Sequence, residues 1–211
     1  CRSYVCHSAP HFKRQEQELK DLIRFAMPDD AGRILEIYAP YITDTVISFE
    51  YDVPTLADFT ARVERISSKY PYIVYERDGV VVGYAYASPY IERAAYDYTV
   101  DLSVYVDAAY CGQNIGECLY AALLDILAKQ GFYNAYACIT ATNRNSLNFH
   151  KRMGFADAGT HLLAGFKHGK WLDVCWYYKR LQADSNPPQP LKQISSFNNS
   201  DLLQPDETYK K

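Results

Sequence analysis

The feature that most constrains this chain is a strand that runs through a short glycine-containing loop into a helix. Residues 101–132 read DLSVYVDAAYCGQNIGECLYAALLDILAKQGF. The first part alternates between apolar and polar residues, which is typical of a β-strand, and apolar residues then recur at helical spacing over 115–127. The pattern therefore predicts an α/β chain in which loop 111–116 stands at the amino end of a helix.

This loop has the composition of a phosphate-binding turn. The first N–H groups of a helix have no partner within the helix, and glycines let the chain curl so that several of them converge on one anion. The loop is not a Walker A motif and lacks the Gly-x-Gly-x-x-Gly spacing of dinucleotide-binding folds. A strand-to-helix turn can also carry glycines for geometry alone, so the loop by itself leaves both interpretations open.

The rest of the chain supports one α/β domain. Patterning predicts the order β-α-α-β-β-β-α-β-α-β-β over residues 21–182, with a mixed and mostly antiparallel sheet flanked by helices. The clearest hairpin turns at Asp78-Gly79, a residue pair that accepts positive φ angles, and a second glycine-bearing turn is expected at His168-Gly169. Thr55 and Asp58, three residues apart, predict the start of a helix. Residues 183–211 are rich in Pro, Ser, Asn and charge, and we expect a flexible polar tail there and a flexible segment at 1–20.

Composition excludes several classes of function. The chain carries 22 Lys and Arg against 25 Asp and Glu, a net charge of −3, so no general attraction to nucleic acid or an anionic membrane is expected. Its apolar runs are too short to cross a membrane, and its N-terminus lacks the apolar core of a signal peptide. The six cysteines form no Cys-x-x-Cys pair, which indicates buried thiols in the cytoplasm and no metal.

Five segments in a fixed order carry a family resemblance. They read IRFAMPDDAGRILEIYAPYITDTVISFE, KYPYIVYERDGVVVGYAYA, AYDYTVDLSVYV, TNRNSLNFHKRMGF and GFKHGKWLDVCWY. Together they resemble the GNAT superfamily of N-acetyltransferases, and within it the group that acetylates phosphinothricin and methionine sulfoximine. The resemblance extends from about Ile23 to Leu181 and implies the GNAT fold.

The resemblance also implies acetyl-CoA as the acetyl donor. Its pantetheine arm is expected along the strand, and its diphosphate on the loop. The family's Gln or Arg at the first loop position is a cysteine here. Asn143, at the start of a short helix, is expected to face the donor and also fits a simple helix cap. The expected donor-binding residues are Val104, Tyr105, Val106, Cys111, Gly112, Gln113, Asn114, Ile115, Gly116 and Asn143.

Asp101 is the candidate general base. Strand alternation places it on one face with Ser103 and Tyr105, and a carboxylate inside an apolar strand is costly unless it is paired or used. The triplet Thr99-Val100-Asp101 resembles the family's Thr-Val-Glu, whose Glu is the base that deprotonates the acceptor amine. A structural aspartate held in a salt bridge is the alternative.

The acceptor site is expected around Arg93, Phe49, Glu50 and Tyr90, which match family segments that border it. The sequence therefore predicts an N-acetyltransferase that acts by direct transfer on the primary amine of a small amino-acid-like molecule. A homodimer is expected, as in relatives. The alternatives are the same fold acting on another amine, such as a polyamine or aminoglycoside, and a non-catalytic acyl-CoA-binding module.

Overall fold

The computed structural model describes residues 21–185 and 187–208, so the predicted N-terminal segment at 1–20 lies outside the described residues. The order of strands and helices through β7 is the predicted one. The elements are β1 (Asp21–Phe25), α1 (Ala31–Thr43), α2 (Leu56–Ser67), β2 (Tyr72–Arg77), β3 (Val80–Pro89), β4 (Thr99–Val106), α3 (Ile115–Gln130), β5 (Asn134–Thr140), α4 (Arg144–Arg152), β6 (Ala156–Lys167), β7 (Lys170–Arg180) and α5 (Pro205–Thr208).

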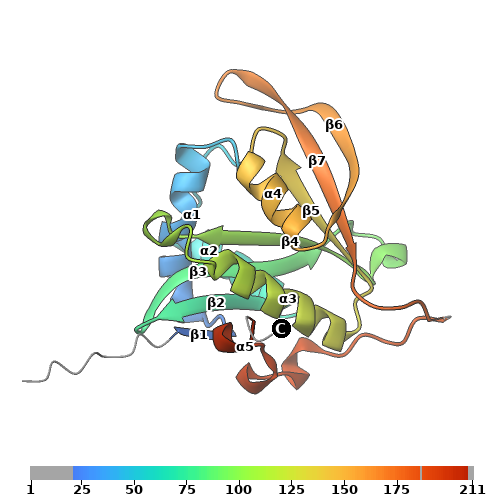
Figure 1. Cartoon of the computed structure of the whole chain (residues 1–211). Helices are drawn as coiled ribbons and strands as arrows, with labels where there is room; N and C mark the ends of the chain where they lie inside the picture. Colours follow the sequence, from blue (N-terminus) through green and yellow to red (C-terminus); the bar gives the residue numbers. More distant parts are fainter. Residues whose placement is uncertain (1–20, 186, 209–211) are drawn as a thin grey trace, which may run out of the picture.

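One seven-stranded sheet organises the fold, with the strand order β1-β2-β3-β4-β5-β7-β6. Every neighbouring pair is antiparallel except β4 and β5, which are parallel. The prediction of a mixed, mostly antiparallel sheet flanked by helices is confirmed. Figure 1 shows the consequence for shape, because β5 and the long β6–β7 hairpin turn away from β4.

Turn chemistry explains the two long hairpins. Asp78 and Gly79 join β2 to β3 with φ values of 51° and 81°, and His168 and Gly169 join β6 to β7 with φ values of 48° and 72°. Left-handed pairs of this kind match the twist of the strands that they connect. The sequence predicts both turns from their Asp-Gly and His-Gly pairs.

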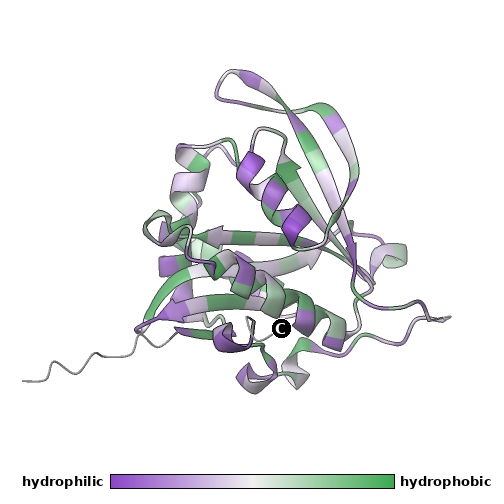
Figure 2. Cartoon of the chain, in the orientation of Figure 1, coloured by the Kyte–Doolittle hydropathy of each residue, from purple (hydrophilic) through white to green (hydrophobic). Residues whose placement is uncertain are grey.

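Helices cover both faces of the sheet (Figure 1). α3 lies on one face, where its residues Ile115 and Leu119 meet Gly83 of β3 closely enough that a β-carbon there would crowd them. α1 and α2 lie on the other face, and α2 begins at Thr55, whose hydroxyl accepts from the Asp58 amide as its sequence predicts. Figure 2 shows apolar residues along the central strands and polar residues along α4, which lies at the surface.

The segment after β7 differs from the predicted flexible tail. Residues 187–208 pack along α3 and β1 through two 3-10 turns and α5. Leu202 is 3% exposed, and the side-chain amide of Gln204 bonds both the N–H and the C=O of Ile23, at 3.0 Å each. The tail therefore satisfies main-chain groups on β1, the edge strand of the sheet, as a further strand would.

Candidate functional site

The candidate site begins where two neighbouring strands of the sheet diverge. The parallel strands β4 and β5 pair only from Thr99 to Asp101, where Asp101 lies opposite Tyr136. Beyond this point β4 continues to Val106 with β3 on one side and no described strand on the other. Main-chain groups of β4 along this open edge are thus available to a ligand that lies between the two strands.

The glycine-containing loop stands beside this opening, at the amino end of α3. Gly112 has a φ of 77° and Asn114 a φ of 61°, both in the left-handed region that glycine and asparagine tolerate best. Asn114 is the N-cap of α3, and its side chain makes no capping bond. The first N–H groups of α3 therefore remain available, at the positive end of the helix dipole.

A cavity of about 510 Å³ joins the open edge to the loop. Nine of the ten residues predicted to bind the donor line it: Val104, Tyr105, Val106, Cys111, Gly112, Asn114, Ile115, Gly116 and Asn143. Gln113 does not, since its side chain accepts a hydrogen bond from Arg77. Asn143 caps α4 by accepting from the Ser146 amide at 3.1 Å, so its cap role and its place at the cavity coexist.

Asp101 lies where β4 and β5 diverge. Its Oδ1 atom is shielded from solvent and has no hydrogen-bond partner, and among the described residues it forms no ion pair. Burial raises the pKa of Asp101 to about 7, against a smaller lowering by the Leu102 amide. The alternative of a salt-bridged structural aspartate finds no support in these contacts.

The four predicted acceptor residues do not form one cluster. Glu50 pairs with Arg62 at 2.6 Å and accepts from the Tyr38 hydroxyl at 3.1 Å. Phe49 is 39% exposed. Tyr90 stacks on Tyr136 with a centroid distance of 4.5 Å.

Arg93, in the loop between β3 and β4, lies elsewhere, near the carboxyl end of α2. It lines a second cavity of about 440 Å³ together with Arg65 and Lys69. The structure therefore brings Tyr90 to Tyr136, the residue of β5 that lies opposite Asp101. It places Arg93 with Arg65 and Lys69 in a separate cavity.

Several residues that line the cavity were not expected from the sequence. Tyr41 of α1 donates its hydroxyl to the Val106 carbonyl at 2.5 Å, and Ile47 lines the cavity from the loop that follows α1. Arg152 of α4 also lines it and pairs with Glu117 at 2.9 Å. Arg152 thus places a guanidinium near a loop that lacks a basic side chain, with its charge balanced by Glu117. The sequence carries no signal for these residues, because each comes from an element far from the loop.

His150 lines the cavity but is fully engaged in the core. Its Nδ1 lies 2.8 Å from the Ser146 carbonyl and its Nε2 lies 2.9 Å from the Tyr120 hydroxyl. This arrangement fits a neutral ring that donates from Nδ1 and accepts at Nε2. Burial lowers the pKa of His150 to about 4, so the ring stays neutral at physiological pH, as a structural histidine does.

Residues 21–185 and 187–208 hold no group of three or more His, Cys, Asp or Glu side chains that could bind a metal ion. Within the same residues, every helix is too short or too polar for a membrane crossing.

Comparison with known sequences agrees with this geometry. The model of the acetyltransferase (GNAT) domain family matches residues 23–176. A phosphinothricin N-acetyltransferase of Streptomyces viridochromogenes is 34% identical over 175 residues, which are 83% of this chain and 95% of that protein. An L-methionine sulfoximine/L-methionine sulfone acetyltransferase of Salmonella typhimurium is 31% identical over 166 residues, 78% of this chain and 97% of that protein.

Comparison with solved structures gives the same fold. The crystal structure of a GNAT superfamily phosphinothricin acetyltransferase from Sinorhizobium meliloti, in complex with acetyl-CoA, matches with a TM-score of 0.76 and 30% sequence identity. The match covers 82% of this chain and 98% of that one.

Proposed function

The chain belongs to the GNAT acetyltransferase family, and from this premise we propose that it acetylates the primary amine of a small amino-acid-like acceptor of the phosphinothricin or methionine sulfoximine type. Acetyl transfer itself follows from the family. The proposal about mechanism and acceptor rests on one observation: Asp101, a desolvated carboxylate without an ion-pair partner, lies next to the cavity-lining residue Leu102, at the point where β4 and β5 diverge.

The open edge of β4 and loop 111–116 support acetyl-CoA as the donor. The main-chain groups of residues 104–106 that face the open edge can bond the pantetheine amides, except for the Val106 carbonyl, which accepts from Tyr41. The N–H groups of 111–116 can bond the diphosphate. Arg152 adds a charge on the same side, and Asn143 faces the cavity. When bound, acetyl-CoA supplies the acetyl group as a reactive thioester.

Asp101 serves as the general base in this mechanism. The attacking amine must lose a proton, and a carboxylate that has lost its water shell accepts a proton more readily than an exposed one. Its pKa of about 7 leaves a large share of the group ionised at neutral pH. A base matched to the working pH is the most effective kind.

Transfer is direct, without an acetylated enzyme. The thiol of Cys138 lines the cavity, but desolvation and the nearby charge of Asp101 raise its pKa to about 12. The thiol therefore stays protonated at neutral pH and is a poor nucleophile. The amine itself is the group that attacks the thioester.

The acceptor lies on the face of β4 that carries Asp101. Tyr90 stacks on Tyr136, which lies opposite Asp101, and Glu50 contacts Tyr38, whose ring meets Tyr105 on this face. Phe49 precedes Glu50 in the loop after α1, and the loop that carries Arg93 leads into β4. Glu50 shapes the acceptor site indirectly, through the hydrogen bond that it accepts from Tyr38 and its ion pair with Arg62.

We also propose a homodimer in the cytoplasm. β6 is an edge strand exposed along most of its length, and Leu162 and Leu163 on it are 75% and 60% exposed. An exposed apolar edge strand pairs readily with a second copy. Cys111, Cys138 and Cys175 are free thiols, as is usual in a reducing compartment.

Thiol release from acetyl-CoA, measured against a panel of L-amino acids, methionine sulfoximine, phosphinothricin and polyamines, tests the proposed function. Turnover on an amino-acid-like member of the panel is the expected result. Turnover only on polyamines would contradict the proposed acceptor class. Binding of acetyl-CoA in calorimetry with no turnover on any acceptor would instead indicate a non-catalytic acyl-CoA-binding module.

A further inference from the structure

A buried lysine at the tip of the β6–β7 hairpin joins three separate parts of the chain. Lys167, the last residue of β6, is only 2% exposed. Its ammonium donates to the Ile42 carbonyl at 2.7 Å and to the Ser48 carbonyl at 2.6 Å. Ile42 belongs to the last turn of α1, where carbonyls lack a helical partner and the dipole favours a positive charge. Ser48 belongs to loop 44–51, which follows α1.

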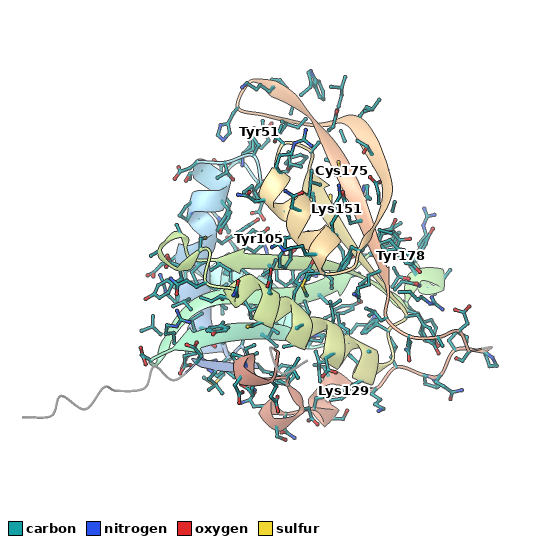
Figure 3. The ribbon with its side chains drawn as sticks, in the orientation of Figure 1. Tyr51, Tyr105, Lys129, Lys151, Cys175 and Tyr178 are labelled. Carbon is teal, nitrogen blue, oxygen red and sulfur yellow. The ribbon has the colours of Figure 1, made fainter. Side chains whose placement is uncertain are left out.

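Two further contacts hold the same loop against the same hairpin. The Tyr51 hydroxyl donates to the Phe166 carbonyl, and Figure 3 shows Tyr51 close to the hairpin tip. The Phe49 ring packs so tightly on Gly165 that a β-carbon there would overlap it. The hairpin tip therefore fixes loop 44–51 at Phe49 and Tyr51 as well as at Ser48.

Loop 44–51 in turn forms a wall of the cavity. Ile47 lines the cavity directly. The Ser48 hydroxyl lies 2.8 Å from the Tyr38 hydroxyl, and the Tyr38 ring meets the Tyr105 ring edge-on with a centroid distance of 4.9 Å. Tyr105 shares its face of β4 with Asp101, so a shift of the loop reaches the face on which the acceptor is proposed to bind.

We propose that Lys167 is a positioning residue for the acceptor. It acts through loop 44–51, and the inference rests on the proposed function of the site. Loss of its ammonium leaves two carbonyls without their charged donor in a place that water scarcely reaches. The loop then no longer has a fixed position, and the acceptor loses its alignment with Asp101 and the donor. The donor loop at 111–116 makes no contact with Lys167 and keeps its geometry.

The test compares Lys167→Met with Lys170→Met. Lys170 is the cross-strand neighbour of Lys167 in the same hairpin, but its side chain is exposed. For Lys167→Met we expect the KM for methionine sulfoximine to rise by about 10-fold to 100-fold, since small misplacements near a reacting group have effects of this size. The KM for acetyl-CoA stays at the wild-type value, and Lys170→Met matches the wild type in both.

Hydrogen–deuterium exchange supplies a readout that needs no turnover. Amides of residues 46–51 exchange faster in Lys167→Met than in Lys170→Met, while α3 remains protected. Wild-type exchange in the loop together with an unchanged acceptor KM would overturn the proposal. Faster exchange throughout the chain with equal rises in both KM values would also overturn it, because that result indicates a merely structural lysine.

A second variant approaches the same loop from another residue. Gly165→Ala forces the Phe49 ring to move without touching Lys167, and it is expected to raise the acceptor KM and loop exchange in the same way. It also replaces Lys167→Met if that protein does not fold. A wild type that turns over no acceptor at all refutes the proposed function, and the exchange measurement then decides the role of Lys167 alone.

Discussion

The two walls of the cavity are built in different ways. On the donor side, loop 111–116 and the start of α3 are continuous in sequence and present main-chain N–H groups. The proposed acceptor side is assembled from α1, loop 44–51 and β4, and the β6–β7 hairpin tip holds the loop through side chains such as Lys167. A wall of main-chain groups suits a ligand common to a whole family, whereas a wall of side chains can differ with each acceptor. We therefore expect the choice of acceptor to be made on the assembled wall.

The largest expected effect comes from Asp101→Asn, which should impair acetyl transfer and leave the binding of acetyl-CoA on the other wall intact. We expect kcat to fall by about 10²-fold to 10⁴-fold, the usual contribution of a general base, with acetyl-CoA affinity unchanged. In the wild type, kcat/KM declines below pH 7, because protonation of a carboxyl with a pKa of about 7 removes the base. The pH profile of the variant lacks this decline and keeps only the decline that is caused by protonation of the acceptor amine. Steady-state rates between pH 5 and 9 measure both.

Thermal unfolding of the same variant distinguishes the base from a structural aspartate. Burial holds the folded pKa of Asp101 at about 7, above the ordinary value of 3.8, so the folded protein retains a proton that the unfolded chain releases between these pH values. The free energy of unfolding of the wild type therefore falls as pH rises through this window, by an amount of the order of a few kcal/mol. At pH 8 Asp101→Asn should melt above the wild type, and near pH 4 the two should agree. If Asp101 were ion-paired instead, Asp101→Asn would be less stable than the wild type at pH 8. Asp29→Asn, at an exposed site, is the control.

A smaller effect tests the donor wall. Gly112→Ala places a β-carbon at a φ of 77°, in the loop that is proposed to bind the diphosphate. Gly79→Ala makes the same change at a φ of 81° in the β2–β3 turn, and neither β-carbon meets an atom within 4 Å. Both should lose about 1–2 kcal/mol of stability to the left-handed backbone. Only Gly112→Ala should raise the acetyl-CoA KM, by about 10-fold if one charged hydrogen bond is lost. Equal KM values in the two variants would show that the glycine serves geometry alone.

The contrast between a wall that is continuous in sequence and a wall that is assembled from distant segments also explains which features the sequence predicts. The hairpin turn at Asp78, the cap at Thr55 and the loop before α3 are set by neighbours in sequence, and the structure has all three as expected. The ion pair of Glu50 with Arg62 joins elements that only the folded chain brings together. Arg152 reaches the cavity by the same kind of long-range placement. Local patterns carry no information about such contacts, because they depend on the packing of one element against another.

The tail after β7 gives a weaker test of the contrast between local patterns and long-range contacts, at the β1 edge of the sheet. Its composition predicts flexibility, because composition counts apolar residues without regard to their partners. In the structure a single glutamine, Gln204, bonds both main-chain groups of Ile23, and Leu202 is buried. Gln204→Ala should therefore cost about 1–2 kcal/mol of stability, the value of two hydrogen bonds, and lower Tm by about 2–6 °C.

Gln193→Ala is the matched control, since its side chain is exposed in the same tail. Calorimetric unfolding of both variants measures the difference, and kcat and both KM values should remain at wild-type levels because the tail lines neither cavity. Equal Tm values for the two variants would mean that the contact with β1 adds nothing to stability. A Tm loss confined to Gln204→Ala would show that a polar tail is held by a few specific long-range bonds, as the acceptor wall is held by Lys167.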